Sequence, residues 1–173
     1  MGVINGVQAV YKVMIAQGFG HIVNTASVAG LMPMPGMAAY STTKHGVVGL
    51  SKSLRAEAAH FGIRVSVLCP GVIRTQILEG GGKFGRMLVD IPSETMNRMW
   101  ESFNPMPPAE FAEKALDAIA RNKAVIVVPS WWKRFWWINR LTPSFGLALA
   151  QKRFEADLRT FNAGQTKQGG DIS

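Results

Sequence analysis

Two stretches decide the fold and the chemistry of this chain: Ile22-Val23-Asn24-Thr25-Ala26-Ser27 and Tyr40-Ser41-Thr42-Thr43-Lys44. The first is short and partly β-branched, as a buried strand is, and it ends on a serine. In the second, Tyr40 and Lys44 are spaced i, i+4, which places them one turn apart on one face of a helix. If Ser27 meets them at the strand end, a phenol, an ammonium and a hydroxyl surround one point. That combination suits proton transfer to or from a carbonyl or alcohol oxygen.

Apolar periodicity and turn residues divide the rest of the chain into alternating helices and strands. We expect helices over residues 3–17, 38–60 and from 108 onward, and short apolar strands over residues 21–25, 64–69 and 124–128. On the first helix we expect a buried stripe of Val3, Val7, Val10 and Met14. On the second helix the expected buried stripe is Val47, Leu50, Leu54 and Ala58. Residues 73–104, rich in Gly and Met, are expected to be irregular. Strands that alternate with helices predict an α/β fold whose parallel sheet is covered on both faces, although three strands are few for such a sheet.

The composition is that of one globular domain. Of the 173 residues, 47% are hydrophobic and 17% charged, which is enough apolar material for one core. Cys69 is the single cysteine, so no internal disulfide can form and a reducing, cytoplasmic compartment is expected. The net charge of +8 permits anionic partners, but the basic residues follow no nucleic-acid module and no nucleic-acid partner is predicted. Neither a signal peptide nor a membrane-spanning stretch is expected.

Four segments of the sequence follow one another in an informative order. They are residues 20–30 with Ser27; the Tyr40–Lys44 motif; residues 64–75 with Pro70-Gly71; and residues 108–129. Together they resemble the short-chain dehydrogenase/reductase family. Ser27 precedes Tyr40 by 13 residues, the spacing usual in that family. A Tyr-x-x-x-Lys motif alone occurs by chance, whereas the four pieces together cover nearly half of the chain. The resemblance implies a doubly wound, Rossmann-like fold, here truncated to about three strands.

The resemblance also implies an activity, the NAD(P)-dependent interconversion of an alcohol and a carbonyl by hydride transfer. Tyr40 would give or take the hydroxyl proton, and Ser27 would hydrogen-bond the substrate oxygen. Lys44 would favour the phenolate of Tyr40, and both residues would contact the cofactor, Lys44 at the nicotinamide ribose. The further nicotinamide-side contacts carried over from the family are Pro70, Gly71, Ile73 and Thr75. The cofactor is NAD or NADP, and no metal is expected, because no His, Cys, Asp or Glu cluster has ligand spacing.

The sequence departs from the family pattern at its start. The family places a glycine-rich turn after its first strand, and no such strand, turn and helix is found here. Residues 80–85 match Gly-x-Gly-x-x-Gly, but no βαβ unit surrounds them, so we interpret them as a flexible loop on the substrate side. Gly2 matches the glycine of the family's Asn-x-x-Gly segment, whose asparagine would precede Met1. We therefore expect the C-terminal portion of a longer reductase, with a partial Rossmann-like domain over residues 1–129 and an extension over residues 130–173, partly disordered at its end.

Two features leave other functions open. Tryptophans interleaved with Lys and Arg over residues 131–137, from Trp131 to Trp137, suit a membrane surface, so the protein could be peripheral to a membrane. The same side chains could instead pack over the sheet edge, cover an apolar pocket or join a subunit contact. Family members commonly form dimers or tetramers through the helices equivalent to residues 3–17 and 38–60. A homo-oligomer is therefore expected at full length, a non-catalytic interaction module is the alternative to an enzyme, and this chain alone should be poorly stable or need a partner.

Seven methionines lie in segments that, by the resemblance, flank the substrate cleft: Met32, Met34, Met37, Met87, Met96, Met99 and Met106. Flexible apolar side chains suit an apolar small-molecule alcohol or carbonyl, although filling of an ordinary core would use them equally well.

Overall fold

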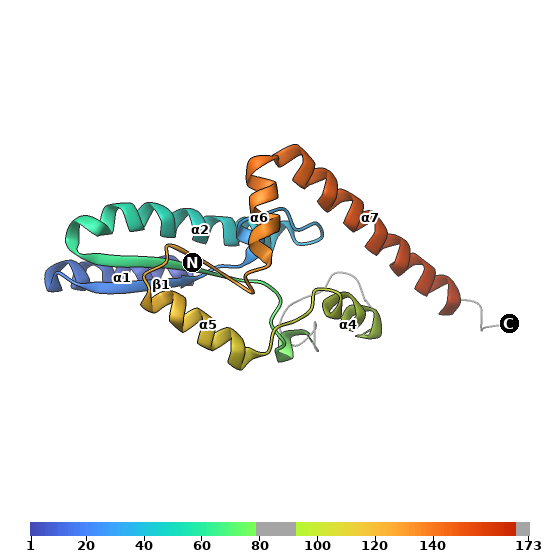
Figure 1. Ribbon diagram of the computed structural model, residues 1–173, viewed down its shortest axis with the longest axis horizontal. Helices are drawn as coiled ribbons and strands as arrows, with labels where there is room; N and C mark the ends of the chain where they lie inside the picture. The colour runs from blue at the N-terminus through green and yellow to red at the C-terminus, as the bar shows by residue number, and fades with distance from the viewer. Residues whose placement is uncertain (79–92, 169–173) are drawn as a thin grey trace.

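A three-stranded parallel sheet lies at the centre of the fold. The computed structural model describes residues 1–78 and 93–168 (Figure 1). Strands β1 (Gly20–Thr25), β2 (Ile63–Pro70) and β3 (Val125–Val128) pair in the order β1-β2-β3. The register runs from Gly20 opposite Ile63 to Thr25 opposite Leu68, and β3 begins opposite Val67. The predicted α/β fold and its three strands are confirmed.

Helices α1 (Gly2–Gln17) and α2 (Ala38–Ala58) match the first two expected helices, and α1 ends at Gly18 in the left-handed conformation. The buried face of α1 differs from the predicted stripe. Val7 is buried with Tyr11, Met14 and Ile15 beside it, whereas Val10 is 39% exposed. Positions i+4, i+7 and i+8 from Val7 face the sheet, and i+3 turns away from it. On α2 the buried residues are Val48, Ser51, Leu54 and Ala58, so the stripe lies about one position beyond the predicted one at its start.

The two faces of the sheet are covered by different helices. Helices α1 and α2 pack on one face, where Ile22 and Val65 join the buried cluster. Helix α5 (Pro108–Ala120), the third expected helix, covers the other face through Ala115 and Ala118, which contact Leu68, Ile126 and Val128. The central strand β2 is therefore buried on both faces and reads as a nearly continuous apolar run. On β1, Val23 and Thr25 are exposed, because α5 packs over β2 and β3 rather than over β1.

Two parts of the chain contain helices that the sequence did not predict. Residues 73–104 include a short 3-10 helix, Gln76–Leu78, and the helix α4 (Ser93–Glu101), so the expectation of an irregular segment is wrong there. After β3 the chain forms α6 (Trp132–Leu141) and α7 (Pro143–Gln168). Figure 1 shows α6 standing beside the start of α2 and α7 running away from the sheet. Residues 80–85, with the glycine-rich match, and the last five residues lie outside the described part.

Candidate active site

The candidate site lies where the three parallel strands end, the edge at which α/β sheets place ligands. Ser27 follows β1 directly, after Ala26, whose N–H donates to the carbonyl of Leu68 at 2.7 Å. Ser27 has an extended backbone and caps the 3-10 helix Val28–Gly30, with its Oγ accepting from the Ala29 N–H at 3.2 Å. The residue is only 9% exposed. The serine is thus held by the strand before it and the helical turn after it.

The first turns of α2 bring Tyr40 and Lys44 to the same end of β1. The Lys44 Nζ lies 3.5 Å from the carbonyl oxygen of Thr25, and 5.4 Å from the centroid of the Tyr40 ring. Gly30 permits this approach, because a Cβ there would lie 2.5 Å from the carbonyl oxygen of Lys44. Tyr40 itself is 41% exposed. An exposed phenol beside an ammonium is an arrangement that can exchange a proton with a bound molecule.

Cys69 forms part of the floor of this site. Burial raises the pKa of its thiol to about 12, while the backbone N–H of Ser27 and the charge of Lys44 act in the opposite direction. The thiol is therefore protonated at neutral pH, and a protonated thiol is neither a nucleophile nor a metal ligand. Its role beside Ser27 and Lys44 is that of a small apolar side chain.

Pro70 and Gly71 end the central strand. The Gly71 N–H donates to the carbonyl of Val128 at 2.8 Å, which fastens the turn to β3. A Cβ on Gly71 would lie 2.1 Å from Nε1 of Trp132, so the glycine leaves the space in which this indole packs. Trp132 is 4% exposed, and its Nε1 has no hydrogen-bond partner in the described structure. Sequence reasoning did not single out Trp132 as a neighbour of Pro70-Gly71.

The other two carried-over residues, Ile73 and Thr75, continue from this turn. Ile73 forms a parallel bridge with Met106, and the carbonyl of Thr75 accepts from the Leu78 N–H at 3.0 Å. Between them, the guanidinium of Arg74 binds the Glu101 carboxylate through two bonds of 2.5 and 2.9 Å, a pairing that lowers the pKa of that carboxyl. The segment after Gly71 is thereby tied to α4.

Aromatic side chains surround the Gly71 side of the site. Trp131 stacks on Trp132 with ring centroids 4.4 Å apart, and Phe103 stacks on the same indole at 5.8 Å. Trp100 and Met34 are partly buried against the same cluster, in which Met32 is fully buried. Three of the four tryptophans of residues 131–137 therefore pack inward or are half-buried, and only Trp137 is widely exposed.

Neither a metal centre nor a membrane span is indicated by the part of the chain that the structure describes. Within residues 1–78 and 93–168, no group of three or more His, Cys, Asp or Glu side chains could hold a metal ion. No helix in these same ranges is long and apolar enough to cross a bilayer.

Known proteins share this arrangement of strands and helices. The family model described as short chain dehydrogenase matches residues 1–83, a range that contains Ser27, Tyr40, Lys44 and the Pro70-Gly71 turn. The chain belongs to the short-chain dehydrogenase/reductase family. Levodione reductase of Leifsonia aquatica is 42% identical over 82 residues, which are 47% of this chain and 31% of that protein.

Two further comparisons reach beyond the first half of this short-chain dehydrogenase/reductase. Dehydrogenase/reductase SDR family protein 7-like of Drosophila melanogaster is 34% identical over 152 residues, covering 84% of this chain and 43% of that protein. A short-chain dehydrogenase/reductase from Burkholderia phymatum, solved in complex with NAD, is 26% identical to this chain and superposes with a TM-score of 0.68. The match covers 83% of this chain and 55% of the Burkholderia chain. The chain thus spans less than half the length of the Leifsonia and Drosophila proteins, and the match with the Drosophila protein reaches beyond β3.

Proposed function

We propose that this chain carries the catalytic segment of an NAD(P)-dependent oxidoreductase, which interconverts an alcohol and a carbonyl by hydride transfer. The proposal is supported by the place of Lys44, whose Nζ lies 3.5 Å from the carbonyl oxygen of Thr25 at the end of β1 and 5.4 Å from the centroid of the Tyr40 ring. Ser27 follows that same strand end, two residues after Thr25. The cofactor, NAD or NADP, would supply the hydride. The half-buried ammonium of Lys44, the Pro70-Gly71 turn and the unpartnered indole N–H packed against Gly71 fit the nicotinamide half of such a molecule.

Each of the three side chains has a distinct task in this proposal. The Ser27 Oγ already accepts from the Ala29 N–H, so its own hydrogen is left to donate to the substrate oxygen. The Tyr40 hydroxyl exchanges the proton with that oxygen, and its exposure leaves room for a substrate beside it. The Lys44 ammonium lies near the Tyr40 ring and stabilises the negative charge that develops on the phenol oxygen. Lys44 and Tyr40 would hold the nicotinamide ribose, with Pro70, Gly71, Ile73 and Thr75 along the nicotinamide.

The substrate is proposed to be apolar. Trp100, Phe103, Trp131 and Met34 are partly buried against the cluster that contains Trp132, the neighbour of Gly71. Aromatic and thioether side chains favour a hydrocarbon-rich alcohol or ketone over a sugar or a charged acid.

The test uses the protein purified from its source cell through an affinity tag fused after Ser173. NADH or NADPH oxidation is followed with a panel of apolar ketones. The variant Y40F should lower turnover by a factor of about 10² to 10⁴, the usual contribution of a positioned acid or base. The matched control is Y11F, because Tyr11 is the only other tyrosine and packs on α1, away from the site.

Energy transfer from tryptophan to bound NADH supplies the second readout. It should persist in Y40F, which separates loss of proton transfer from loss of cofactor binding. Equal turnover by Y40F and the wild type would refute the proposal. If neither transfer nor turnover occurs with any cofactor, the alternative of a non-catalytic interaction module is favoured.

A homo-oligomer is proposed for the intact protein. Helix α1 exposes Val10 and Val13, which lie one turn apart on the face that points away from the sheet. Sedimentation of the tagged protein, compared with a V10S/V13S variant, tests it: an unchanged mass on substitution would argue against an α1 contact.

A further inference from the structure

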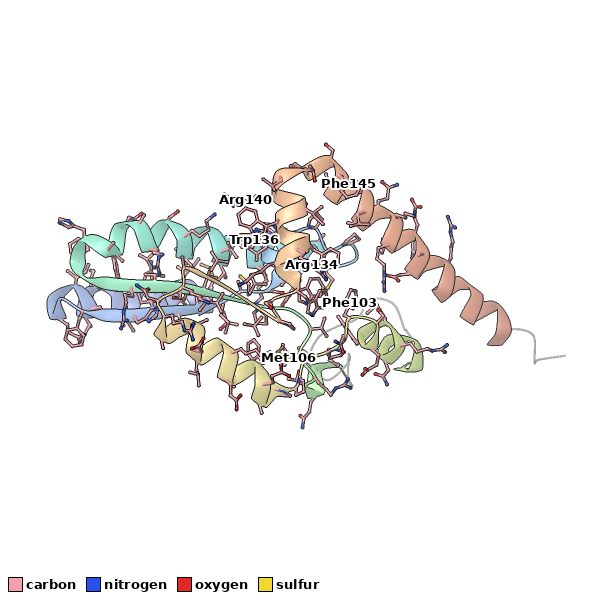
Figure 2. The ribbon with its side chains drawn as sticks, in the orientation of Figure 1. Phe103, Met106, Arg134, Trp136, Arg140 and Phe145 are labelled. Atoms are coloured by element: carbon pink, nitrogen blue, oxygen red, sulfur yellow. The ribbon has the colours of Figure 1, made fainter. Side chains whose placement is uncertain are left out.

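The corner between α6 and α7 exposes large apolar side chains that the site does not use. Trp137, Leu141 and Phe145 are 50%, 72% and 60% exposed. Arg134, one turn before Trp137, and Arg140, next to Leu141, are also exposed. These five residues define the α6–α7 corner. Figure 2 places Arg140 and Phe145 where the two helices meet, at the part of the molecule that projects beyond α2.

The two sides of α6 have different partners. Trp132 and Trp136, spaced i, i+4, pack against the core cluster that contains Cys69. Arg134, Trp137 and Leu141, spaced i, i+3, i+7, share the opposite side of the helix. Within the segment Trp131–Trp137, for which a membrane surface was one of the alternatives, Trp132 is buried, whereas Trp137 is exposed and continues into exposed side chains up to the first turn of α7.

The charged residues of α6 and of the first part of α7 are all basic. No Asp or Glu occurs between Asp117 and Glu155, and five basic residues of that interval lie on these two helices: Lys133, Arg134, Arg140, Lys152 and Arg153. Arg153 is bound to Asp157 and turned toward Ser102, so it points away from the corner. Two aromatic side chains and a leucine, with arginines beside them and no carboxylate between them in the sequence, complement a surface that is negative at its headgroups and apolar below them.

We propose that the α6–α7 corner docks on the surface of an anionic lipid bilayer. Trp137, Leu141 and Phe145 would enter the boundary between headgroups and acyl chains, while Arg134 and Arg140 would contact lipid phosphates. The contact is peripheral. The docked surface adjoins the candidate site, because α6 begins at Trp132, which packs on Gly71. The proposal stands independently of the hydride-transfer chemistry.

Flotation of the full chain with lipid vesicles tests the proposal. The probe is a vesicle of phosphatidylcholine with phosphatidylglycerol, compared with phosphatidylcholine alone. We expect the chain to bind the anionic vesicles, and binding to weaken at high salt. The variant R134Q/R140Q should bind roughly 30-fold more weakly, since each basic residue near an anionic surface is worth about fivefold. W137S/L141S should bind about tenfold or more weakly, through the apolar area it removes.

Matched controls use residues of similar exposure elsewhere. L116S/F19S removes two exposed apolar side chains from α5 and from the turn after α1, which are 66% and 67% exposed, and K12Q/K52Q removes two exposed charges from α1 and α2. Both controls should bind within about twofold of the wild type, as ordinary surface substitutions do. Circular dichroism confirms that each variant remains folded.

Several results would overturn the proposal. One is absence of binding to anionic vesicles, and another is equal binding to phosphatidylcholine alone. A third is a loss in the controls as large as in the corner variants. If W137S/L141S instead lowers the mass of the chain in solution without changing vesicle binding, a second copy of the chain covers the corner and the lipid proposal is wrong.

Discussion

Replacement of Gly30 by alanine should destabilise the fold and displace Lys44. The added Cβ would lie 2.5 Å from the Lys44 carbonyl oxygen and 3.0 Å from a methyl carbon of Val48. The first of these neighbours is backbone in the middle of a helix, so no side-chain rotation can relieve the contact. Helix α2 would have to move by about 0.5 Å or more relative to the 3-10 helix Val28–Gly30. Overpacking of this kind costs about 1–3 kcal/mol.

Gly46 and Gly49 provide the matched controls on the same helix. Neither has any atom within 4 Å of an added Cβ. Alanine at either position should therefore stabilise the chain by roughly 0.5–1 kcal/mol, through the higher helix propensity of alanine. G30A and the controls thus differ in sign, although each adds a single methyl group.

Urea unfolding followed by tryptophan fluorescence measures the difference. Each kcal/mol also corresponds to roughly 2–4 °C in Tm for a domain of this size. The reasoning fails if G30A is as stable as the wild type, because the contact with Lys44 would then not constrain α2. It fails equally if G46A and G49A lose as much stability as G30A at a concentration where the chain is monomeric.

Two further predictions concern titratable groups on the strands, the half-buried His21 and the buried Cys69. His21 hydrogen-bonds Ser66 at 2.8 Å between β1 and β2, and burial, with Arg64 and Arg55 next, lowers its pKa. The unfolded chain binds the proton more readily, so stability is full above the ordinary histidine pKa and is lost as the pH falls from about 6.5 through the lowered value. An H21Q variant should remove this slope from urea midpoints measured across that range, and a slope that persists in H21Q would assign it to other groups. Burial raises the pKa of the Cys69 thiol to about 12. The folded chain should therefore react with a thiol reagent at neutral pH more than about 10³-fold more slowly than a free cysteine does. Modification of the folded chain at the rate of the urea-unfolded chain would contradict this.

The fold was largely predictable because its determinants are local. Strands β1 and β2 are short β-branched runs bounded by glycine and proline, and the Tyr40–Lys44 motif lies in a helix long enough to show its period. Helix α4 was missed because the Gly- and Met-rich composition of residues 73–104 was taken to indicate an irregular segment, although Met96, Met99 and Trp100 are spaced i, i+3, i+4. Val10 was misplaced for a different reason. A spacing of i+3 from Val7 is compatible with burial, and only the contacts of α1 with the sheet show that i+4 is used instead.

The neighbours of the site were less predictable than its reactive groups. Ser27 and Tyr40 are 13 residues apart and adjoin the same strand, so their spacing in the sequence already indicates that they lie at the same end of β1. Trp132 lies 61 residues beyond Gly71, and it reaches that turn because Pro70 pairs with Val128 in the parallel register. The register between two strands that are far apart in the sequence cannot be predicted from the sequence of either strand alone.

Two glycines connect the site to the helices that bound it, and both act through the space they leave rather than through a positive φ. Gly30 admits the backbone of α2 at Lys44, and Gly71 admits the indole of Trp132 at the start of α6. Each contact joins the end of a strand to the first turns of a helix, so the positions of Lys44 and Trp132 relative to the strand ends are set by close packing. Close packing does not deform gradually. A methyl group added at either glycine should therefore shift the helix and the site residues together. Side chains on the outer side of α6 make no such contact, so they can be replaced without moving the strand ends.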